Sequence, residues 1–444
     1  MIRENWIKVE LGEVIKLKNG YAFKSSKYKD IGIPIIRISD INQGIVKADS
    51  AKMIDESEEY DDYQVEFKDI LIAMSGATTG KFGIYKDSKK TYQNQRVGNL
   101  KPHSEQHIDK LYIYYLLYSL RQRIEKDAYG GAQPNISGKK IESLEFNLAP
   151  LPEQRAIVAK IEQLLSDLDN GIANLKIAKG KLEIYRQAVL KKAFEGGFTN
   201  RDYKPGELPE GWERISLEDY GEWRGGGTPS KRNNEYWENG NVLWVSPKDM
   251  KTKIIVQTQD KITEVSIDQS SAKWIEKGAI LFVVRSGIIR RILPIALAGK
   301  RLTINQDLQS FLPNNKLISE FVYWYCVSEE RTIRDICAKD GTTVDNINVP
   351  MLKRYSIPLT TLPEQSQIVQ EIETRLSVCD KLTESIDQSL DKSEALRQSI
   401  LKKAFEGRLL SEEELEACRQ EHDWEPAKKL FARIKAEKVK TSKI

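Results

Sequence analysis

The chain has 444 residues, which is too long for one ordinary domain and favours two to four. It carries 69 Lys and Arg against 65 Asp and Glu, so the net charge of +4 excludes a polybasic coat and leaves nucleic-acid binding to local patches. No apolar run approaches the ~20 residues that cross a bilayer, and the first six residues lack the apolar core of a secretory signal. We therefore expect a cytoplasmic protein without a membrane role.

Residues 1–150 are predicted to form an α+β globule. Short apolar segments bounded by turn residues, such as 33–38 and 69–74, are typical of strands, and residues 110–126 are predicted to be helical. The loops between them mix Gly with Lys, Arg, Asn and Gln, the side chains that contact phosphates and read base edges. The DNA-binding candidates in these loops are Lys18, Asn19, Lys81, Gln93, Arg96, Gln133, Lys139 and Lys140.

A long helix is predicted next, over residues 151–197. Pro152 suits the first helical turn, Glu153 follows where the helix dipole favours an acid, and Gly196 stands where a helix commonly stops. Apolar residues recur at alternating spacings of four and three, the pattern of a coiled-coil seam. The residues predicted to pair along this seam are Ile161, Leu168, Leu175 and Leu182.

A polar segment with Gly and Pro, residues 198–211, is a predicted linker to a second α+β globule over residues 212–361. Its predicted strands include 242–245 and 279–284, and residues 317–338 are predicted to be helical. Its DNA-binding candidates are Arg224, Lys231, Arg232, Arg285, Arg290, Arg291 and Lys339. For any single charged loop, a solvated turn is the competing interpretation.

A second long helix is predicted over residues 362–408, and it repeats the first. At a shift of 211 residues, 22 of 47 positions are identical between 151–197 and 362–408. The same shift aligns Ser75-Gly76 with Ser286-Gly287 and Asn94-Gln95 with Asn305-Gln306. The residues predicted to pair along the second seam are Ile372, Leu382, Ile386 and Leu396. A C-terminal extension, residues 409–444, follows.

The order globule, helix, globule, helix predicts the overall fold class. Two similar helices that follow two similar globules can pair antiparallel about a pseudo-two-fold axis, with the helices as a spacer between the globules. Ordinary core helices are the alternative interpretation. If the two halves read different sequences, base-reading residues should lie where the copies differ, which favours Arg285, Arg290 and Arg291.

Motifs for catalysis are not found in the sequence. The segment from Gly76 to Phe82 resembles a phosphate-binding loop, but it is one residue short between its glycines and has Phe where Ser or Thr binds magnesium. His103 and His107 lack a third metal ligand nearby, and the four cysteines have no paired spacing. We expect buried free thiols, no metal site and no catalytic residue.

Several motifs together resemble the specificity subunit of Type I restriction-modification systems over essentially the full length. They are the Leu-Pro-Glu-Gln-x-x-Ile-Val openings at Leu151 and Leu362, the two Arg-Gln-x-x-Leu-Lys-Lys-Ala-Phe-Glu-Gly closings, the Leu-Pro-Glu-Gly-Trp segment at 208–212 and the segment 425–437. One departure is that the first globule begins at Asn5-Trp6 without the Leu-Pro-Glu-Gly that precedes the second.

The resemblance implies that each globule is a target recognition domain that reads one half of an interrupted sequence in double-stranded DNA. It also implies that the helices set the unread gap and dock two modification subunits, which methylate adenine at N6 with S-adenosylmethionine. Restriction subunits, where present, add translocation and cleavage with ATP and Mg²⁺. This chain would then be non-catalytic and would hold none of these cofactors.

Two other classes of function remain open at this stage. One is a stand-alone DNA methyltransferase or nuclease, and the other is a coiled-coil scaffold without a DNA role. The target sequence, the length of the gap and the number of partner subunits cannot be read from the sequence, because base preference depends on the geometry of loops.

Overall fold

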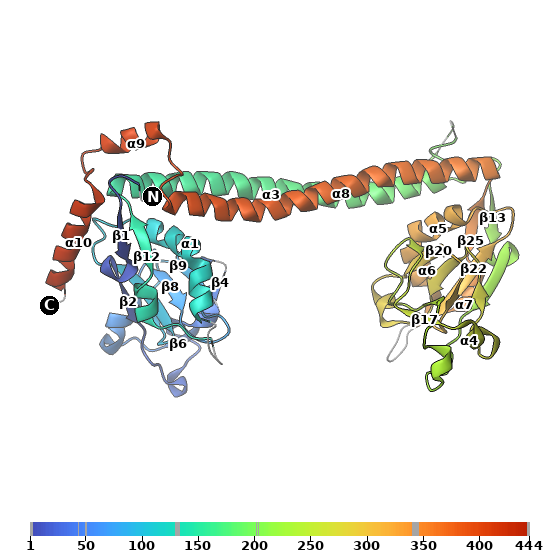
Figure 1. Cartoon of the computed structure of the whole chain (residues 1–444), viewed down its shortest axis with the longest axis horizontal. Helices are drawn as coiled ribbons and strands as arrows, with labels where there is room; N and C mark the ends of the chain where they lie inside the picture. The colour runs from blue at the N-terminus through green and yellow to red at the C-terminus, as the bar shows by residue number, and fades with distance from the viewer. Residues whose placement is uncertain are drawn as a thin grey trace. The chain divides into compact units, whose positions relative to one another are not determined.

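The computed structural model describes residues 3–42, 44–48, 51–128, 134–200, 202, 204–339 and 346–441. The chain divides into two compact units: unit 1 comprises Met1–Leu175 and Gln388–Ile444, and unit 2 comprises Lys176–Asp387. Each unit contains an α+β globule, the first part of one long helix and the last part of the other (Figure 1). The predicted α+β class with two long paired helices is confirmed.

Unit 1 is built on two sheets and a helical cover. The large sheet has the strand order β2-β11-β8-β9-β5-β4 and the small sheet has the order β6-β3-β10-β7. A short antiparallel pair, β1 (Ile7–Glu10) with β12 (Glu145–Leu148), lies beside them. The remaining elements are β2 (Ile15–Asn19), β3 (Ile33–Ile36), β4 (Ile41–Asn42), β5 (Gly44–Val46), β6 (Lys52–Ile54), β7 (Gln64–Val65), β8 (Ile70–Ala73), β9 (Phe82–Tyr85), β10 (Thr91–Gln93), β11 (Val97–Pro102), α1 (Lys110–Ala128) and α2 (Gly138–Glu142).

Unit 2 repeats this plan. Its large sheet has the order β14-β22-β19-β20-β16, its small sheet has the order β17-β15-β21-β18, and β13 pairs with β25. The segment predicted as one helix at 317–338 is two helices, α5 and α6, that meet at Glu329. The elements are β13 (Glu213–Ser216), β14 (Gly221–Gly225), β15 (Val242–Val245), β16 (Ile254–Ile255), β17 (Asp260–Ile262), α4 (Glu264–Asp268), β18 (Trp274–Ile275), β19 (Ile280–Val283), β20 (Ile295–Ala298), β21 (Leu302–Ile304), β22 (Leu308–Pro313), α5 (Ser319–Ser328), α6 (Glu330–Cys337), β23 (Ala338–Lys339), β24 (Asn346–Ile347), α7 (Val349–Lys353) and β25 (Ser356–Leu359).

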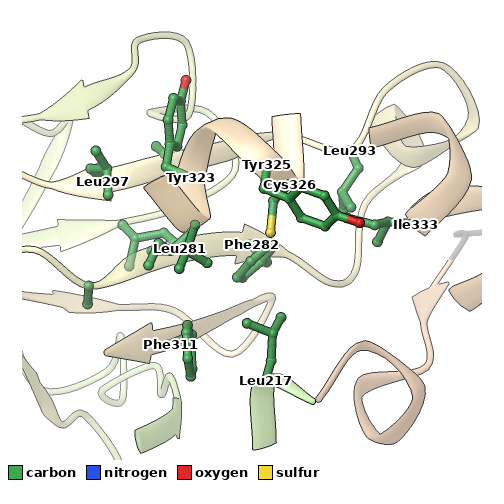
Figure 2. Packing of buried hydrophobic residues seen from close by; sticks show 14 of the residues in the cluster. Leu217, Leu281, Phe282, Leu293, Leu297, Phe311, Tyr323, Tyr325, Cys326 and Ile333 are labelled. Atoms are coloured by element: carbon green, nitrogen blue, oxygen red, sulfur yellow. The ribbon is translucent and has the colours of Figure 1, made fainter. Parts of the chain in front are cut away.

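The core of unit 2 lies between its large sheet and α5. All four residues of β19 are buried, which is why the segment reads as a continuous apolar run and not as an alternating one. Figure 2 shows Cys326 of α5 pointing at Phe282 of β19, with Phe311 of β22 below. Burial raises the pKa of the Cys326 thiol to about 12. All four cysteines are free and buried, as the sequence predicts.

The Leu-Pro-Glu-Gln motif fastens each long helix to the globule that precedes it. In α3 (Leu151–Phe194), the buried Glu153 accepts a hydrogen bond from the indole Nε1 of Trp6 at 2.7 Å. In α8 (Leu362–Phe405), Glu364 accepts one from Trp212 at 3.1 Å. The next residues, Gln154 and Gln365, make the same two contacts in each unit. Each accepts a hydrogen bond from a backbone N–H at the start of α1 (Gln154) or α5 (Gln365), and each donates one to a backbone carbonyl that precedes its own long helix.

Those glutamine contacts satisfy backbone groups that would otherwise be buried without partners. Asp109 N donates to Gln154 Oε1 at 3.1 Å, and Ile318 N donates to Gln365 Oε1 at 2.9 Å. Both glutamine side chains are fully buried. The repeated motif is therefore a structural joint between globule and helix, and its repetition follows from this shared geometry.

Both long helices end in the same way. Gly196 and Gly407 have φ of 76° and 71°, a left-handed conformation that glycine adopts without steric cost. The next amides, of Gly197 and Arg408, donate to Lys192 O and Lys403 O at 2.8 Å, which completes a Schellman motif at each end. The Gly of the repeated Phe-Glu-Gly closing is thus required by the backbone.

The two helices pack antiparallel within each unit. In unit 1, Ile157 and Ile161 of α3 share a buried cluster with Ile400 and Ala404 of α8. In unit 2, residues near the end of α3, Val189 and Leu190, share one with Ile368, Ile372 and Leu376 near the start of α8. Asp169 pairs with Arg397 in unit 1 and Asp380 pairs with Arg186 in unit 2, each 211 residues from its counterpart, so the same acid–arginine pair recurs in both units.

The residues predicted to pair along the seam differ in burial. Ile161 and Ile372 are fully buried, whereas Leu168, Leu175, Leu182 and Ile386 are half-buried. Leu382 and Leu396 are instead 48% and 51% exposed, and the neighbouring Thr383 and Arg397 are the more buried residues. Polar residues are accommodated because they bond to their own helix: Thr383 Oγ1 donates to Cys379 O, and Ser393 Oγ donates to Ser389 O, both at 2.8 Å.

The C-terminal extension forms α9 (Glu412–Arg419) and α10 (Ala427–Thr441), which pack on unit 1 (Figure 1). Arg155 of α3 pairs with Asp423 at 2.9 Å and with Glu421 at 2.6 Å, and Lys438 donates to Gly12 O at 2.7 Å.

Among the described residues, no helix combines the length and the apolar character needed to cross a membrane.

Candidate DNA interface

Four loops of unit 1 that are far apart in sequence meet at one end of its large sheet. Because β2 and β8 both run antiparallel to β11, the last residues of β2 and β8 lie beside the first residues of β11. Tyr21 N donates to Gln93 O at 2.9 Å, and Met74 N donates to Arg96 O at 3.0 Å. Gly76 N donates to Pro134 O at 3.1 Å. We call segments 18–21, 74–81, 93–97 and 134–136 the loop end of unit 1.

Unit 2 brings together the corresponding four segments. Gly227 N donates to Ile304 O at 3.0 Å, and Val284 N donates to Asp307 O at 2.8 Å. Ile347 N donates to Val284 O at 2.8 Å, as Ile136 N does to Met74 O at 2.9 Å in unit 1. We call segments 224–228, 284–291, 304–308 and 346–347 the loop end of unit 2.

A glycine permits the closest crossing of backbones in each loop end. A Cβ on Gly20 would lie 2.2 Å from Gln93 O, and a Cβ on Gly226 would lie 2.0 Å from Asn305 O. Both distances are far below van der Waals contact, so any larger residue would displace the facing turn. These glycines are therefore needed for the two segments to meet, whatever the segments bind.

The repeated Asn-Gln pairs form the facing turn. Asn94 Oδ1 accepts a hydrogen bond from Arg96 N at 3.3 Å, and Asn305 Oδ1 accepts one from Asp307 N at 3.0 Å. Asn94 N donates to Ile36 O at 3.0 Å, and Asn305 N donates to Val245 O at 2.9 Å. Each Asn thus closes an Asx turn and ties the large sheet to the small sheet, which is a structural role common to both copies.

The segment that resembles a phosphate-binding loop is the connection of a β-hairpin. Residues 74–81 join β8 to β9, and Ala73 N donates to Lys81 O while Gly80 N donates to Ala73 O, both at 2.8 Å. Gly76 and Gly80 have φ near 83°, which fits tight turns. A nucleotide-binding loop is followed by a helix, whereas this one is followed by a strand.

The DNA-binding candidates of unit 1 fall into three groups in the structure. Asn19, Lys81 and Arg96 are exposed on the loop end, and Lys139 and Lys140 are exposed on the adjacent α2, where Lys140 pairs with Asp127 at 3.6 Å. Lys18 is half-buried and pairs with Asp62 at 3.5 Å. Gln93 is buried and donates to Lys18 O and Val97 O, so in this structure it holds the turn.

The candidates of unit 2 are more strongly paired. Arg224 is held by Glu222 at 2.6 Å, and Arg285 is held by Asp307 at 2.6 Å. Lys231 lies 6.0 Å from the ring centre of Trp237. Arg232, Arg290 and Arg291 are exposed. Gln133 and the side chain of Lys339 lie outside the described residues.

Reasoning from sequence missed one residue of the loop ends, Asp307, and misaligned another, Ser75. Asp307 was missed because only basic and amide side chains were considered for DNA contact. Ser75 was aligned with Ser286, but the structure pairs Ser75 with Asn135 and Arg285 with Asn346 across the same bridge, so Arg285 is the counterpart of Ser75. A count of residues between the bridge and the Asn-Gln turn, which differs by one between copies, is the signal that could have revealed this.

Among the described residues, no cluster of three or more His, Cys, Asp or Glu could hold a metal ion. His103 Nε2 lies 3.2 Å from Gly12 O, and its burial lowers the pKa of its imidazole. His107 Nδ1 lies 2.8 Å from Ser104 Oγ and 3.4 Å from Glu437.

Two α+β globules with the same plan, each with a loop end that carries basic and amide side chains, define the class of this chain as a duplicated two-domain protein. Comparison with known proteins identifies this class. The family model described as the Type I restriction modification DNA specificity domain matches residues 3–176 and again residues 209–392. The chain belongs to this family.

Individual relatives carry the same description. The chain is 33% identical over 293 residues to the EcoR124I/EcoR124II specificity subunit of Escherichia coli, covering 65% of this chain and 67% of that protein. It is 25% identical over 467 residues to the EcoBI specificity subunit of Escherichia coli, covering 99% and 93%. Among solved structures, the HsdS subunit from Thermoanaerobacter tengcongensis matches with a TM-score of 0.61 at 19% identity, covering 92% of this chain and 98% of that chain. The last likeness concerns the fold alone.

Proposed function

We propose that the loop ends are the surfaces that contact DNA, so that unit 1 reads one half of a two-part target and unit 2 reads the other half. The chain is a DNA specificity subunit of a Type I restriction-modification system, in which two domains recognise the target. The observation that supports the assignment to the loop ends is their construction. Their backbone hydrogen bonds correspond between the units, whereas their exposed side chains differ.

A common backbone with different side chains suits two half-targets of different sequence. Base edges are distinguished by the donors and acceptors of side chains, while contacts to phosphates only position the protein. Residues that hold the backbone, such as Asn94 and Asn305, can stay the same in both copies. Residues that read bases must be free to differ.

We assign the catalytic steps to partner subunits. DNA and methyltransferase subunits are the partners of a Type I specificity subunit, and we infer two modification subunits that methylate adenine at N6 with S-adenosylmethionine. Restriction subunits, where the system has them, would use ATP and Mg²⁺. Because the partner is the DNA of the cell, we place the chain in the cytoplasm.

The first test concerns the exposed arginines of unit 2. Arg290→Glu with Arg291→Glu should weaken DNA binding by the assembled complex about 10-fold or more, because two phosphate-neutralising charges are reversed, and should lower the salt dependence of binding. Arg331→Glu is the control for charge reversal alone, since Arg331 is 85% exposed on α6 and lies outside the four segments of the loop end. Equal affinity of wild type and double variant at matched salt, with assembly intact, would remove these residues from the interface.

We further propose that α3 and α8 set the unread gap and dock the modification subunits. Replacing the half-buried Leu168 and Leu175 by Asp should disrupt helix pairing and complex assembly, because two buried-side charges would lack partners. Size-exclusion chromatography of the complex measures the loss. An intact and fully active complex that carries both substitutions would contradict this role.

A stand-alone enzyme makes the opposite prediction from a recognition subunit. The purified chain, incubated with DNA, S-adenosylmethionine and Mg²⁺, should leave the DNA unmethylated and uncut until modification subunits are added. Methylation or cleavage by the chain alone would overturn the proposal in favour of a methyltransferase or nuclease.

A further inference from the structure

The two loop ends differ most informatively at one pair of facing positions. Met74 N donates to Arg96 O in unit 1, and Val284 N donates to Asp307 O in unit 2. The next residues, Ser75 and Arg285, form the equivalent bridges to Asn135 and Asn346. Position 75 of unit 1 therefore corresponds to position 285 of unit 2, and position 96 corresponds to position 307.

The arginine occupies a different one of these two positions in each unit. Unit 1 has Ser75 on the strand side and Arg96 on the turn side, whereas unit 2 has Arg285 on the strand side and Asp307 on the turn side. Arg96 is exposed, and no ion-pair partner for it occurs among the described residues. Each loop end thus offers one guanidinium at the same junction of strand and turn, from opposite directions.

In unit 2 the guanidinium is held in place. Arg285 Nε and Nη2 each lie 2.6 Å from Asp307 Oδ1, and Asp307 Oδ2 accepts a hydrogen bond from Asn305 Nδ2 at 3.0 Å. The Arg285 side chain is nevertheless 51% exposed, while that of Asp307 is 21% exposed. The guanidinium has five N–H donors in a planar fork, so it can keep Asp307 on one edge and present another edge outward.

We propose that Arg285, oriented by Asp307, reads the guanine of one base pair in the half-target of unit 2, and that Arg96 does so at the equivalent place in unit 1. A guanidinium donates two parallel hydrogen bonds to O6 and N7 of guanine, which a lysine cannot reproduce. The acid fixes Arg285 before DNA arrives, so unit 2 discriminates at that base pair more strictly than unit 1. This inference rests on the proposed function of the loop ends.

Selection from randomised DNA by the assembled complex tests the inference. The wild type should select a two-part motif with a G·C pair in the half that unit 2 reads. Arg285→Ala and Arg285→Lys should both lose discrimination at that single pair by about 5- to 150-fold, the range for one bidentate contact, while the other half is unchanged. Arg331→Ala, another exposed and acid-paired arginine of unit 2, should select the wild-type motif.

A second variant transfers the pair to the other unit. Ser75→Arg combined with Arg96→Asp rebuilds the arrangement of unit 2 in unit 1, so the variant should still select a G·C pair in the half read by unit 1, but more strictly than the wild type does. The half read by unit 2 should be unchanged. Thermal unfolding of the free chain checks that the variant is folded. Folding is expected because the same two residue types already occupy this junction in unit 2.

The outcomes separate the inference from the proposed function. If Arg285→Ala weakens all sequences equally and Arg285→Lys restores binding, Arg285 contacts phosphate and the inference is wrong, although the proposed function stands. If all variants select the wild-type motif with wild-type affinity, the inference is also wrong. If the wild-type complex selects no two-part motif, the proposed function fails and the inference fails with it.

Discussion

In both units the same kind of turn precedes the first strand of the globule, but different residues form it. Trp6 N donates to Arg3 O and Trp212 N donates to Pro209 O, both at 3.1 Å. Between them stands Asn5 in unit 1, with φ of 68°, and Gly211 in unit 2, with φ of 83°. Asn is, after Gly, among the residues that tolerate this left-handed conformation best. The absence of Leu-Pro-Glu-Gly before Trp6 therefore leaves the turn intact.

The loop ends differ in another way. There the backbone contacts correspond, but an exposed arginine lies on the strand side in unit 2 and on the turn side in unit 1. The comparison separates two kinds of position. Where the backbone sets the requirement, only residues with the same conformational freedom replace one another, and where the side chain faces outward, its chemistry and position both change.

The largest effect is expected in the joint between helices and globules. Ile161→Ala and Ile372→Ala should each lower the free energy of unfolding by about 2–5 kcal/mol, because both side chains are fully buried and their removal leaves a cavity. Leu382→Ala is the matched control on the same helix, and it should change stability by less than ~0.5 kcal/mol because Leu382 is 48% exposed. Urea denaturation of the full chain measures all three. If Leu382→Ala lowers the free energy of unfolding as much as Ile372→Ala does, Leu382 belongs to the helix-pairing seam, as the sequence pattern predicts.

A smaller effect is expected where the backbones cross in the loop ends. Gly20→Ala and Gly226→Ala should each cost about 1–3 kcal/mol, since the new methyl group meets a backbone oxygen. Gly287→Ala should be close to neutral, because nothing lies within 4 Å of a Cβ there. If the two crossings are equivalent, both variants should also weaken DNA binding. If the alanine substitution destabilises one unit and not the other, the two backbone crossings are not equivalent.

The smallest effect is expected at the entry turn. Gly211→Ala and Asn5→Ala should each cost about 1–2 kcal/mol, because alanine is strained at positive φ, while Asn5→Gly should be nearly neutral. At Gly211 the cost is conformational only, since a Cβ there meets no atom within 4 Å. Thermal melting of the three variants compares them. Equal stability of Asn5→Ala and wild type would show that the turn is not required.

The sequence predicts the elements well where one pattern dominates. The long helices start at Leu151 and Leu362 as expected, because proline, acid and amide residues specify a helix start. The predicted strand 242–245 coincides with β15, and 279–284 contains β19. These strands could be predicted because each is a continuous apolar run bounded by turn residues.

The sequence predicts the candidate interface less well, because position in a fold decides what a polar residue does. Gln93 has the chemistry of a base reader, yet the crossing of two loops buries it against backbone carbonyls. Asp307 has the charge that DNA repels, yet it orients an arginine. Leu382 fits a heptad by spacing, yet the phase of the helix exposes it. The contacts of Gln93 with Lys18 and of Asp307 with Arg285 join residues 75 and 22 positions apart, so spacing alone could not reveal them.

The most direct test of two-part recognition is a genome-wide map of methylated adenines in the host, with and without this chain. Loss of the chain should abolish methylation at a single interrupted motif and leave all other modified sites unchanged. A map that is the same in both strains, or one in which an uninterrupted motif disappears, would contradict the assignment of the two units to two half-targets.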